Sequence, residues 1–297
     1  MNFKGIIPPL TTPFNLNGDL APDKLQANIQ LFNKYELSGY LLLGSNGEFV
    51  MLSDEEKVKV LKAAREVIPK GKIMLAGTGC QSTRETIWLT KKAAEIGADA
   101  ALVLNPFYYK GSMTSEALRV HYNAVADDSP IPVLIYNMPA STGIDMEAQL
   151  IIKLSNHTNI VGLKDSGSNL VKLGEIIKSS APDFSVFSGS AGLLLPALSI
   201  GAVGGILAYA NIAPQQAIDL YNYFRKGQSS DAQTMQFKII ELNTMVTRQF
   251  GVPALKLAMD KLGLYGGPVR KPLLPLDVSA AQILVEKIEN SGLRNKL

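Results

Sequence analysis

The chain has 297 residues, of which 46% are hydrophobic and 19% are charged, a composition typical of a globular protein that can bury a large core. The net charge is +3 and the basic residues are scattered, which argues against a nucleic-acid-binding arm or a basic membrane patch. One cysteine, Cys80, excludes an internal disulfide and a multi-cysteine metal site. No apolar run is long enough to span a membrane and the first residues lack the apolar core of a signal peptide, so we expect a cytoplasmic protein.

Short apolar runs and amphipathic segments alternate along the chain. The apolar runs predict eight buried strands, near residues 5–10, 39–43, 72–76, 98–104, 131–136, 160–164, 184–187 and 202–206. Helical periodicity predicts intervening helices near residues 22–34, 53–67, 83–96, 114–127, 146–154, 168–179 and 191–199. The helix at 53–67 opens on a sequence that fits a capping box, and residues 165–168 offer turn and N-cap chemistry before the helix at 168–179.

This alternation predicts an α/β protein. A (β/α)8 TIM barrel is the simplest closed arrangement of eight such units, and a doubly wound open sheet is the alternative. Further helices, near residues 214–225, 230–249, 252–262 and 278–291, exceed what one barrel needs. We therefore expect a barrel over residues 1–225 and a C-terminal helical extension over residues 226–297, with functional residues at the carboxyl ends of the strands.

Lys164 stands at one of these strand ends, in Asn159-Ile-Val-Gly-Leu-Lys164-Asp-Ser-Gly-Ser168. Desolvation there favours the neutral amine, which is the form that attacks a carbonyl to make a Schiff base. Alternatively, the side chain extends into solvent or pairs with Asp165. The remaining strand ends are polar and contain no second amine and no histidine: Thr11, Thr12, 44–48, Thr78, 105–109, 136–139, 188–190 and 205–206.

The glycine-containing turns allow two interpretations each. In Gly44-Ser-Asn-Gly-Glu48, the backbone amides and the Ser45 and Asn46 side chains could bind a carboxylate, or the segment is a simple turn. The lysine that ends a P-loop is absent. Residues 77–82 partly imitate a dinucleotide fingerprint, but they lack its third glycine and its acidic partner, which argues against NAD binding.

The sequence lacks the residue patterns that two other classes of enzyme require. Two separated histidines, His121 and His157, argue against a metal-dependent aldolase, and no Gly-x-Ser-x-Gly motif surrounds Ser190, which argues against a serine hydrolase. We expect no metal and no cofactor. Tyrosines 108, 109 and 136 either pack at the rim of the barrel or carry protons beside a Schiff-base lysine.

Three ordered motifs resemble the dihydrodipicolinate synthase and N-acetylneuraminate lyase superfamily of pyruvate-dependent class I aldolases. They are Gly44-Ser-Asn-Gly-Glu48, Tyr136-Asn-Met-Pro139 and Gly162-Leu-Lys164-Asp-Ser166, and the likeness extends over essentially the whole chain. The resemblance implies a TIM barrel that binds pyruvate or another 2-oxo acid and assembles as a homotetramer, a dimer of tight dimers.

The resemblance also implies roles for single residues. Lys164 matches the lysine that forms the imine, and Tyr136 matches the tyrosine that relays protons to and from it. Ser45 matches the hydroxyl that links Tyr136 to a second tyrosine. Tyr108 matches this second tyrosine, which reaches into the site of the neighbouring subunit.

Further positions match the parts of the family's site that bind substrate. Asn46, with the Gly47 amide, matches the position that holds the pyruvyl carboxylate, where many relatives have threonine. The Ile206 carbonyl would lie close to the imine. The loops near Ser141, Ser166 and Ser190 would select the acceptor, and in the 4-hydroxy-2-oxoglutarate aldolase subfamily Ser166 would lie near the distal carboxylate.

Position 141 distinguishes between subfamilies. Dihydrodipicolinate synthases carry there an arginine that binds the carboxylate of the aldehyde substrate, and this chain has Ser141. Loss of a charged hydrogen bond of this kind costs about 1.5–3 kcal/mol of binding. Several stretches, including Ser188-Gly-Ser-Ala-Gly192 and Val246-Thr-Arg-Gln-Phe-Gly-Val-Pro253, resemble 4-hydroxy-2-oxoglutarate aldolase more closely.

We therefore expect a lyase that cleaves 4-hydroxy-2-oxoglutarate to pyruvate and glyoxylate. The alternatives are dihydrodipicolinate synthase, which condenses pyruvate with aspartate semialdehyde, and an aldolase or dehydratase of 2-keto-3-deoxy sugar acids. A barrel that binds a small metabolite without catalysis is a hypothesis of a different class. Covalent trapping of pyruvate on Lys164 separates it from the others.

Overall fold

The computed structural model describes residues 3–293, and within them eight strands form one parallel sheet. The strands are β1 (Gly5–Ile7), β2 (Gly39–Leu42), β3 (Ile73–Gly77), β4 (Ala100–Leu104), β5 (Val133–Asn137), β6 (Ile160–Asp165), β7 (Ser185–Ser188) and β8 (Gly204–Ile206). Residues 1–2 of the expected barrel and 294–297 of the expected extension lie outside the described residues.

The sheet closes on itself. From β2 to β8 each strand pairs with its sequence neighbour, and β1 pairs with β8, with Ile7 opposite Ile206. The gap between β1 and β2 is closed by a parallel bridge from Pro9 to Leu41, whose carbonyl accepts a hydrogen bond of 2.8 Å from the Leu10 amide. The predicted (β/α)8 barrel is therefore confirmed, and the open doubly wound sheet is wrong. β1 is shorter than expected because Pro8 and Pro9 have no amide hydrogen to extend the ladder.

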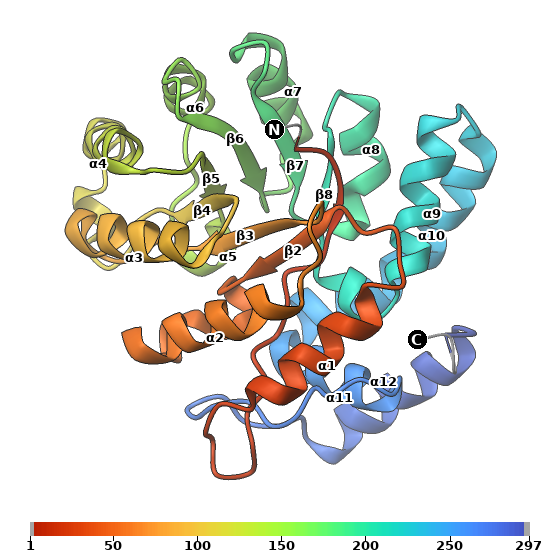
Figure 1. Ribbon diagram of the computed structural model, residues 1–297. Helices are drawn as coiled ribbons and strands as arrows, with labels where there is room; N and C mark the ends of the chain where they lie inside the picture. The colour runs from red at the N-terminus through yellow and green to blue at the C-terminus, as the bar shows by residue number, and fades with distance from the viewer. Residues whose placement is uncertain (1–2, 294–297) are drawn as a thin grey trace.

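Helices follow the strands and surround the barrel (Figure 1). They are α1 (Pro22–Phe32), α2 (Asp54–Val67), α3 (Thr83–Ile96), α4 (Ser115–Asp128), α6 (Ala148–Leu154), α7 (Leu170–Ser179), α8 (Leu194–Ser199) and α9 (Pro214–Arg225), with the short α5 (Pro139–Thr142) between β5 and α6. Apart from α5, each of these helices buries apolar residues on its inner side, as the periodicity predicts.

The first residues of α2 and α7 test two predictions about N-terminal capping. The capping box at α2 is present: the Ser53 amide donates to Glu56 at 2.9 Å, and Ser53 Oγ accepts from the Glu56 amide at 3.3 Å. The expected N-cap of α7 within 165–168 is wrong, because Asn169 caps this helix and accepts a 3.0 Å bond from the Lys172 amide. Residues 165–168 instead form the connection that leaves the barrel mouth.

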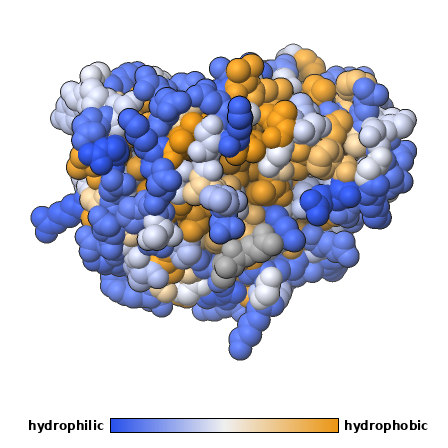
Figure 2. Space-filling view, turned by 90° about the horizontal axis from the view of Figure 1, so that it is seen from above, coloured by the Kyte–Doolittle hydropathy of each residue, from blue (hydrophilic) through white to orange (hydrophobic). Residues whose placement is uncertain are grey.

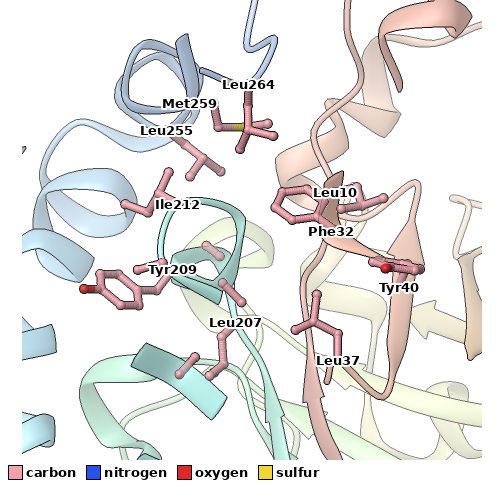
Figure 3. Packing of buried hydrophobic residues seen from close by; sticks show 14 of the residues in the cluster. Leu10, Phe32, Leu37, Tyr40, Leu207, Tyr209, Ile212, Leu255, Met259 and Leu264 are labelled. Atoms are coloured by element: carbon pink, nitrogen blue, oxygen red, sulfur yellow. The ribbon is translucent and has the colours of Figure 1, made fainter. Parts of the chain in front are cut away.

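The C-terminal extension packs on one side of the barrel, beside α1 and α9 (Figure 1). It contains α10 (Ser229–Thr244), a π-helical turn (Met245–Gln249), α11 (Gly251–Lys261) and α12 (Val278–Asn290). Figure 3 shows Leu255 of α11 next to Ile212, which follows β8, and Met259 next to Leu264, and these residues belong to the same buried cluster as Leu10. The core thus continues across residue 225, where α9 ends, so the two expected parts share one hydrophobic interior.

Some large apolar side chains remain at the surface. Figure 2 shows one face of the molecule on which apolar side chains form a patch bordered by polar ones. Phe237 of α10 and Ile283 of α12 are 65% and 52% exposed. None of the helices in residues 3–293 combines the length and apolar character that a membrane span requires. The expected homotetramer stays a prediction.

Candidate active site

Lys164 and Tyr136 lie side by side at the mouth of the barrel. They occupy paired positions near the carboxyl ends of β6 and β5, and residues in register on neighbouring parallel strands point the same way. Lys164 Nζ lies 4.2 Å from the centroid of the Tyr136 ring, and each residue is 4% exposed. Lys164 therefore does not extend into solvent, and no ion pair joins it to Asp165 within the described chain.

The Tyr136 hydroxyl has several polar neighbours. Ser45 Oγ is 3.4 Å away, from the loop after β2. Burial by itself raises the pKa of Tyr136, but the charge of Lys164 and hydrogen bonding with Ser45, Ser166 and Lys164 outweigh burial and lower that pKa below its ordinary value. A phenol that is both buried and easier to deprotonate can exchange protons with a group bound at Lys164.

The loop that carries Ser45 is a 3-10 turn, Ser45–Gly47. Thr12 Oγ1 donates to the Gly47 carbonyl at 2.7 Å and fixes this turn to the segment that follows β1. The Gly47 amide, expected to face a substrate carboxylate, instead donates to the Gly44 carbonyl at 2.9 Å. The Ser45 and Asn46 amides have no acceptor among the hydrogen bonds of the described residues, so these two amides can bind an anion at this turn.

Two residues at the site were not predicted as functional candidates from the sequence. Asn137 follows Tyr136 and Asp165 follows Lys164, and the Asn137 side-chain amide donates to Asp165 Oδ1 at 2.7 Å. The same amide donates to Asp145 at 2.8 Å, and the Met146 amide donates to Asn137 Oδ1 at 3.0 Å. These bonds join the ends of β5 and β6, and thereby hold Tyr136 and Lys164 in register. The register between the two predicted strands would have indicated that Asn137 and Asp165 lie side by side.

The remaining predicted site residues lie around the mouth of the barrel and differ in how deeply they are buried. Ser166 donates its amide to the Asn137 carbonyl at 2.9 Å, and its Oγ lies so close to Gly189 that a Cβ there would stand 2.0 Å away. Ser190 is half-buried and its amide donates to Ser188 Oγ at 3.3 Å. Ile206 is fully buried at the end of β8, whereas Ser141 is exposed in α5. Ser141 thus places a neutral hydroxyl at the rim.

Tyr108 lies away from this group in the single chain. It is 75% exposed and stacks edge-on against Tyr109, with 5.1 Å between ring centroids. The hydrogen bonds of the described residues connect Ser45 to Tyr136 and do not extend to Tyr108. Its expected contribution to a neighbouring subunit stays a prediction.

The described residues contain no group of three or more histidine, cysteine or acidic side chains placed to hold a metal ion. The side chains at the mouth offer an amine, a phenol and hydroxyl groups.

Comparison with known proteins supports the same interpretation of the fold and class. The chain matches the family model described as the dihydrodipicolinate synthetase family over residues 2–291. It is 35% identical over 277 residues to a 4-hydroxy-tetrahydrodipicolinate synthase from Methanothrix thermoacetophila, with 92% of each chain covered. It is 36% identical over 292 residues to a protein of Emericella nidulans named "Probable 4-hydroxy-2-oxoglutarate aldolase, mitochondrial", with 97% of this chain and 94% of the relative covered.

A solved structure gives the same fold. The Escherichia coli K12 prophage protein YagE, a member of the dihydrodipicolinic acid synthase family crystallised with pyruvate, superposes with a TM-score of 0.92, at 31% identity, over 98% of this chain and 99% of that one. The synthase name recurs among the relatives, so the comparisons support the synthase alternative better than the expected 4-hydroxy-2-oxoglutarate aldolase. The chain belongs to the dihydrodipicolinate synthetase family, whose members are class I, pyruvate-dependent aldolases and lyases that form a Schiff base on a lysine.

Proposed function

We propose that Lys164 is the Schiff-base lysine and that the protein makes or breaks a carbon–carbon bond next to pyruvate. The observation that carries this proposal is the buried pair at the barrel mouth, where Lys164 Nζ lies 4.2 Å from the Tyr136 ring centroid and Ser45 Oγ lies 3.4 Å from the Tyr136 hydroxyl. A nucleophile and an acid–base group in contact, held by a hydroxyl, form the arrangement that covalent catalysis requires.

The proposed reaction uses these groups in turn. Once its amine has lost a proton, Lys164 attacks the keto carbon of the 2-oxo acid, Tyr136 protonates the oxygen, and loss of water leaves a protonated imine. In the cleavage direction the bond between the third and fourth carbons breaks, its electron pair enters the imine to give an enamine, and the 4-hydroxyl proton passes to a base, which leaves an aldehyde. In the condensation direction the enamine attacks an aldehyde. The Ser45 and Asn46 amides hold the 1-carboxylate.

One candidate acceptor is aspartate semialdehyde, which gives the synthase reaction. The observation that favours it is the recurrence of the synthase name among relatives such as the Methanothrix protein, at 35% identity over 92% of the chain. The exposed Ser141 hydroxyl would then have to replace the arginine of the synthase pattern, or another cation would have to take over its role.

A second candidate is the cleavage of 4-hydroxy-2-oxoglutarate to pyruvate and glyoxylate. It is favoured by the neutral side chain of Ser141 and by the Emericella relative, at 36% identity. Lys110 brings an ammonium group close to this rim, since a Cβ on Gly143 would stand 3.1 Å from Lys110 Nζ. Both candidates carry a distal carboxylate, and Lys110 is a cation available to it.

The test is borohydride trapping with pyruvate, followed by peptide mapping. We expect the adduct on the peptide that contains Lys164, no adduct in Lys164→Ala, and normal trapping in Lys153→Ala, which removes an exposed lysine of α6. No adduct on the folded wild-type protein would move the assignment to a barrel that binds a metabolite without catalysis.

The acceptor is tested separately from the imine. Values of kcat/KM are compared for condensation with aspartate semialdehyde, for cleavage of 4-hydroxy-2-oxoglutarate and for 2-keto-3-deoxy sugar acids, under one set of conditions. The candidate reaction with the highest kcat/KM is retained, and a value at the level of Lys164→Ala eliminates a candidate.

A further inference from the structure

The turn that carries Ser45 is bounded on both sides by strained backbone. Leu43 and Glu48 have φ values of 58° and 53°, and they are the only non-glycine residues with positive φ in residues 3–293. This left-handed region is unfavourable for residues with a Cβ, and it persists where surrounding contacts impose it. Contacts outside the turn must therefore hold Gly44 to Gly47 in place.

At Glu48, the C-terminal extension supplies these contacts. The Glu48 carboxylate is buried, with Lys256 Nζ at 2.5 Å from Oε1 and the Arg270 amide donating to Oε2 at 2.8 Å. Lys256, in α11, is 1% exposed, donates to the Pro268 carbonyl at 2.8 Å and lies 4.4 Å from the centre of the Phe14 ring. Both ends of the ion pair are thus fixed.

Arg270 fixes the same segment at its outer end. Its guanidinium binds both oxygens of Glu56, at 2.6 and 2.7 Å, and donates to the Met51 carbonyl at 3.0 Å. A bidentate contact of this kind restrains orientation as well as distance. The guanidinium therefore holds Met51 and Glu56, which lie beyond the turn, whereas Lys256 and the Arg270 amide hold Glu48 at the turn itself.

We propose that Glu48 and Lys256 are positioning residues, whose buried ion pair keeps the Ser45–Asn46 turn in its strained geometry and so sets the affinity for the substrate carboxylate. This rests on the proposed function, since it assumes that the turn binds pyruvate. A charge pair suits the role because a buried, hydrogen-bonded carboxylate has few alternative positions, whereas apolar contacts are non-directional. The C-terminal extension then contributes to substrate binding by positioning this turn.

The test separates positioning from stability. In Glu48→Gln the backbone bond from Arg270 survives but Lys256 is left unpaired, so we expect a lower melting temperature and a KM for pyruvate raised about tenfold or more, with kcat changed less than KM. In the double variant Glu48→Gln/Lys256→Met no buried charge is left unpaired. We expect its melting temperature to recover while its KM for pyruvate stays raised.

Glu56→Gln is the matched control, because it weakens a carboxylate contact of Arg270 and leaves the Glu48–Lys256 pair intact. Its KM for pyruvate should stay within about twofold of the wild-type value. The inference is overturned if KM is unchanged in the folded Glu48 variants, if it returns to normal together with the melting temperature in the double variant, or if Glu56→Gln raises it equally. Should Glu48→Gln not fold, the double variant decides alone.

Wild-type trapping is measured in the same series. A wild-type protein that traps no pyruvate overturns the proposed function, and this inference with it. A wild-type protein that traps pyruvate, with variants of unchanged KM, overturns the positioning role only.

Discussion

Replacing Tyr136 by phenylalanine isolates the proton-transfer role of one oxygen atom. The ring that packs 4.2 Å from Lys164 Nζ remains, so the side chain keeps its volume and its contact with the amine. What is lost is the hydroxyl, together with its 3.4 Å contact to Ser45. The variant therefore tests acid–base chemistry with little change in packing.

The structure predicts unequal effects on stability and rate. Loss of one neutral hydrogen bond lowers the free energy of unfolding by about 1 kcal/mol. Loss of a positioned acid–base group lowers kcat by roughly 10²–10⁴-fold, which corresponds to about 2.7–5.5 kcal/mol of transition-state stabilisation. The KM for pyruvate should change far less, because the backbone amides of Ser45 and Asn46, which are proposed to bind the carboxylate, are retained.

Steady-state kinetics and thermal unfolding of Tyr136→Phe provide the measurement. Tyr122→Phe is the matched control: this tyrosine is equally buried and its hydroxyl donates to the Val103 carbonyl at 3.0 Å, on the outer side of the barrel. We expect the control to lose similar stability and to keep its activity. If Tyr136→Phe retains kcat within about threefold, Tyr136 does not relay protons and the mechanism is refuted.

Three further predictions follow from other parts of the chain. Ser45→Ala removes a contact that lowers the pKa of Tyr136, so the alkaline limb of the pH–rate profile should move to higher pH and kcat should fall about tenfold. An alkaline limb at the wild-type pH would show that Ser45 does not influence the pKa of the Tyr136 hydroxyl. Burial lowers the pKa of His121 from 6.5 to about 4, so the unfolded chain binds more protons between these values and stability falls with decreasing pH in that window. Denaturant titrations should show a loss of about 3 kcal/mol there, and His121→Gln should remove this part of the pH dependence. Lys110→Met should raise the KM for an acceptor with a distal carboxylate and leave pyruvate trapping unchanged; equal KM values would exclude Lys110 from acceptor binding.

The sequence predicted much of the site because its residues lie in short ordered motifs. Lys164, Tyr136 and Ser45 each stand at a predicted strand end, and the closed barrel brings those ends to one mouth. The partners of these residues were harder to identify. Asn137 and Asp165 are ordinary polar residues in sequence, and they become a pair only through the register of β5 with β6.

The backbone conformation around the Ser45 turn could not be predicted from local sequence patterns either. The two glycines of the motif permit positive φ, yet the positive φ values that bound the turn belong to Leu43 and Glu48. Neither residue type prefers the left-handed region, so no propensity signals it. It arises from contacts made elsewhere.

What the sequence alone determined is the set of elements and their order, because apolar residues repeat with the periods of strands and helices within windows of a few turns. Only the tertiary structure decided which distant groups meet. The Arg270 amide and the Glu48 carboxylate are 222 positions apart, and a hydrogen bond joins them because the extension packs against the side of the barrel and reaches the loop after β2. Such contacts depend on barrel closure and helix docking, which no local period encodes.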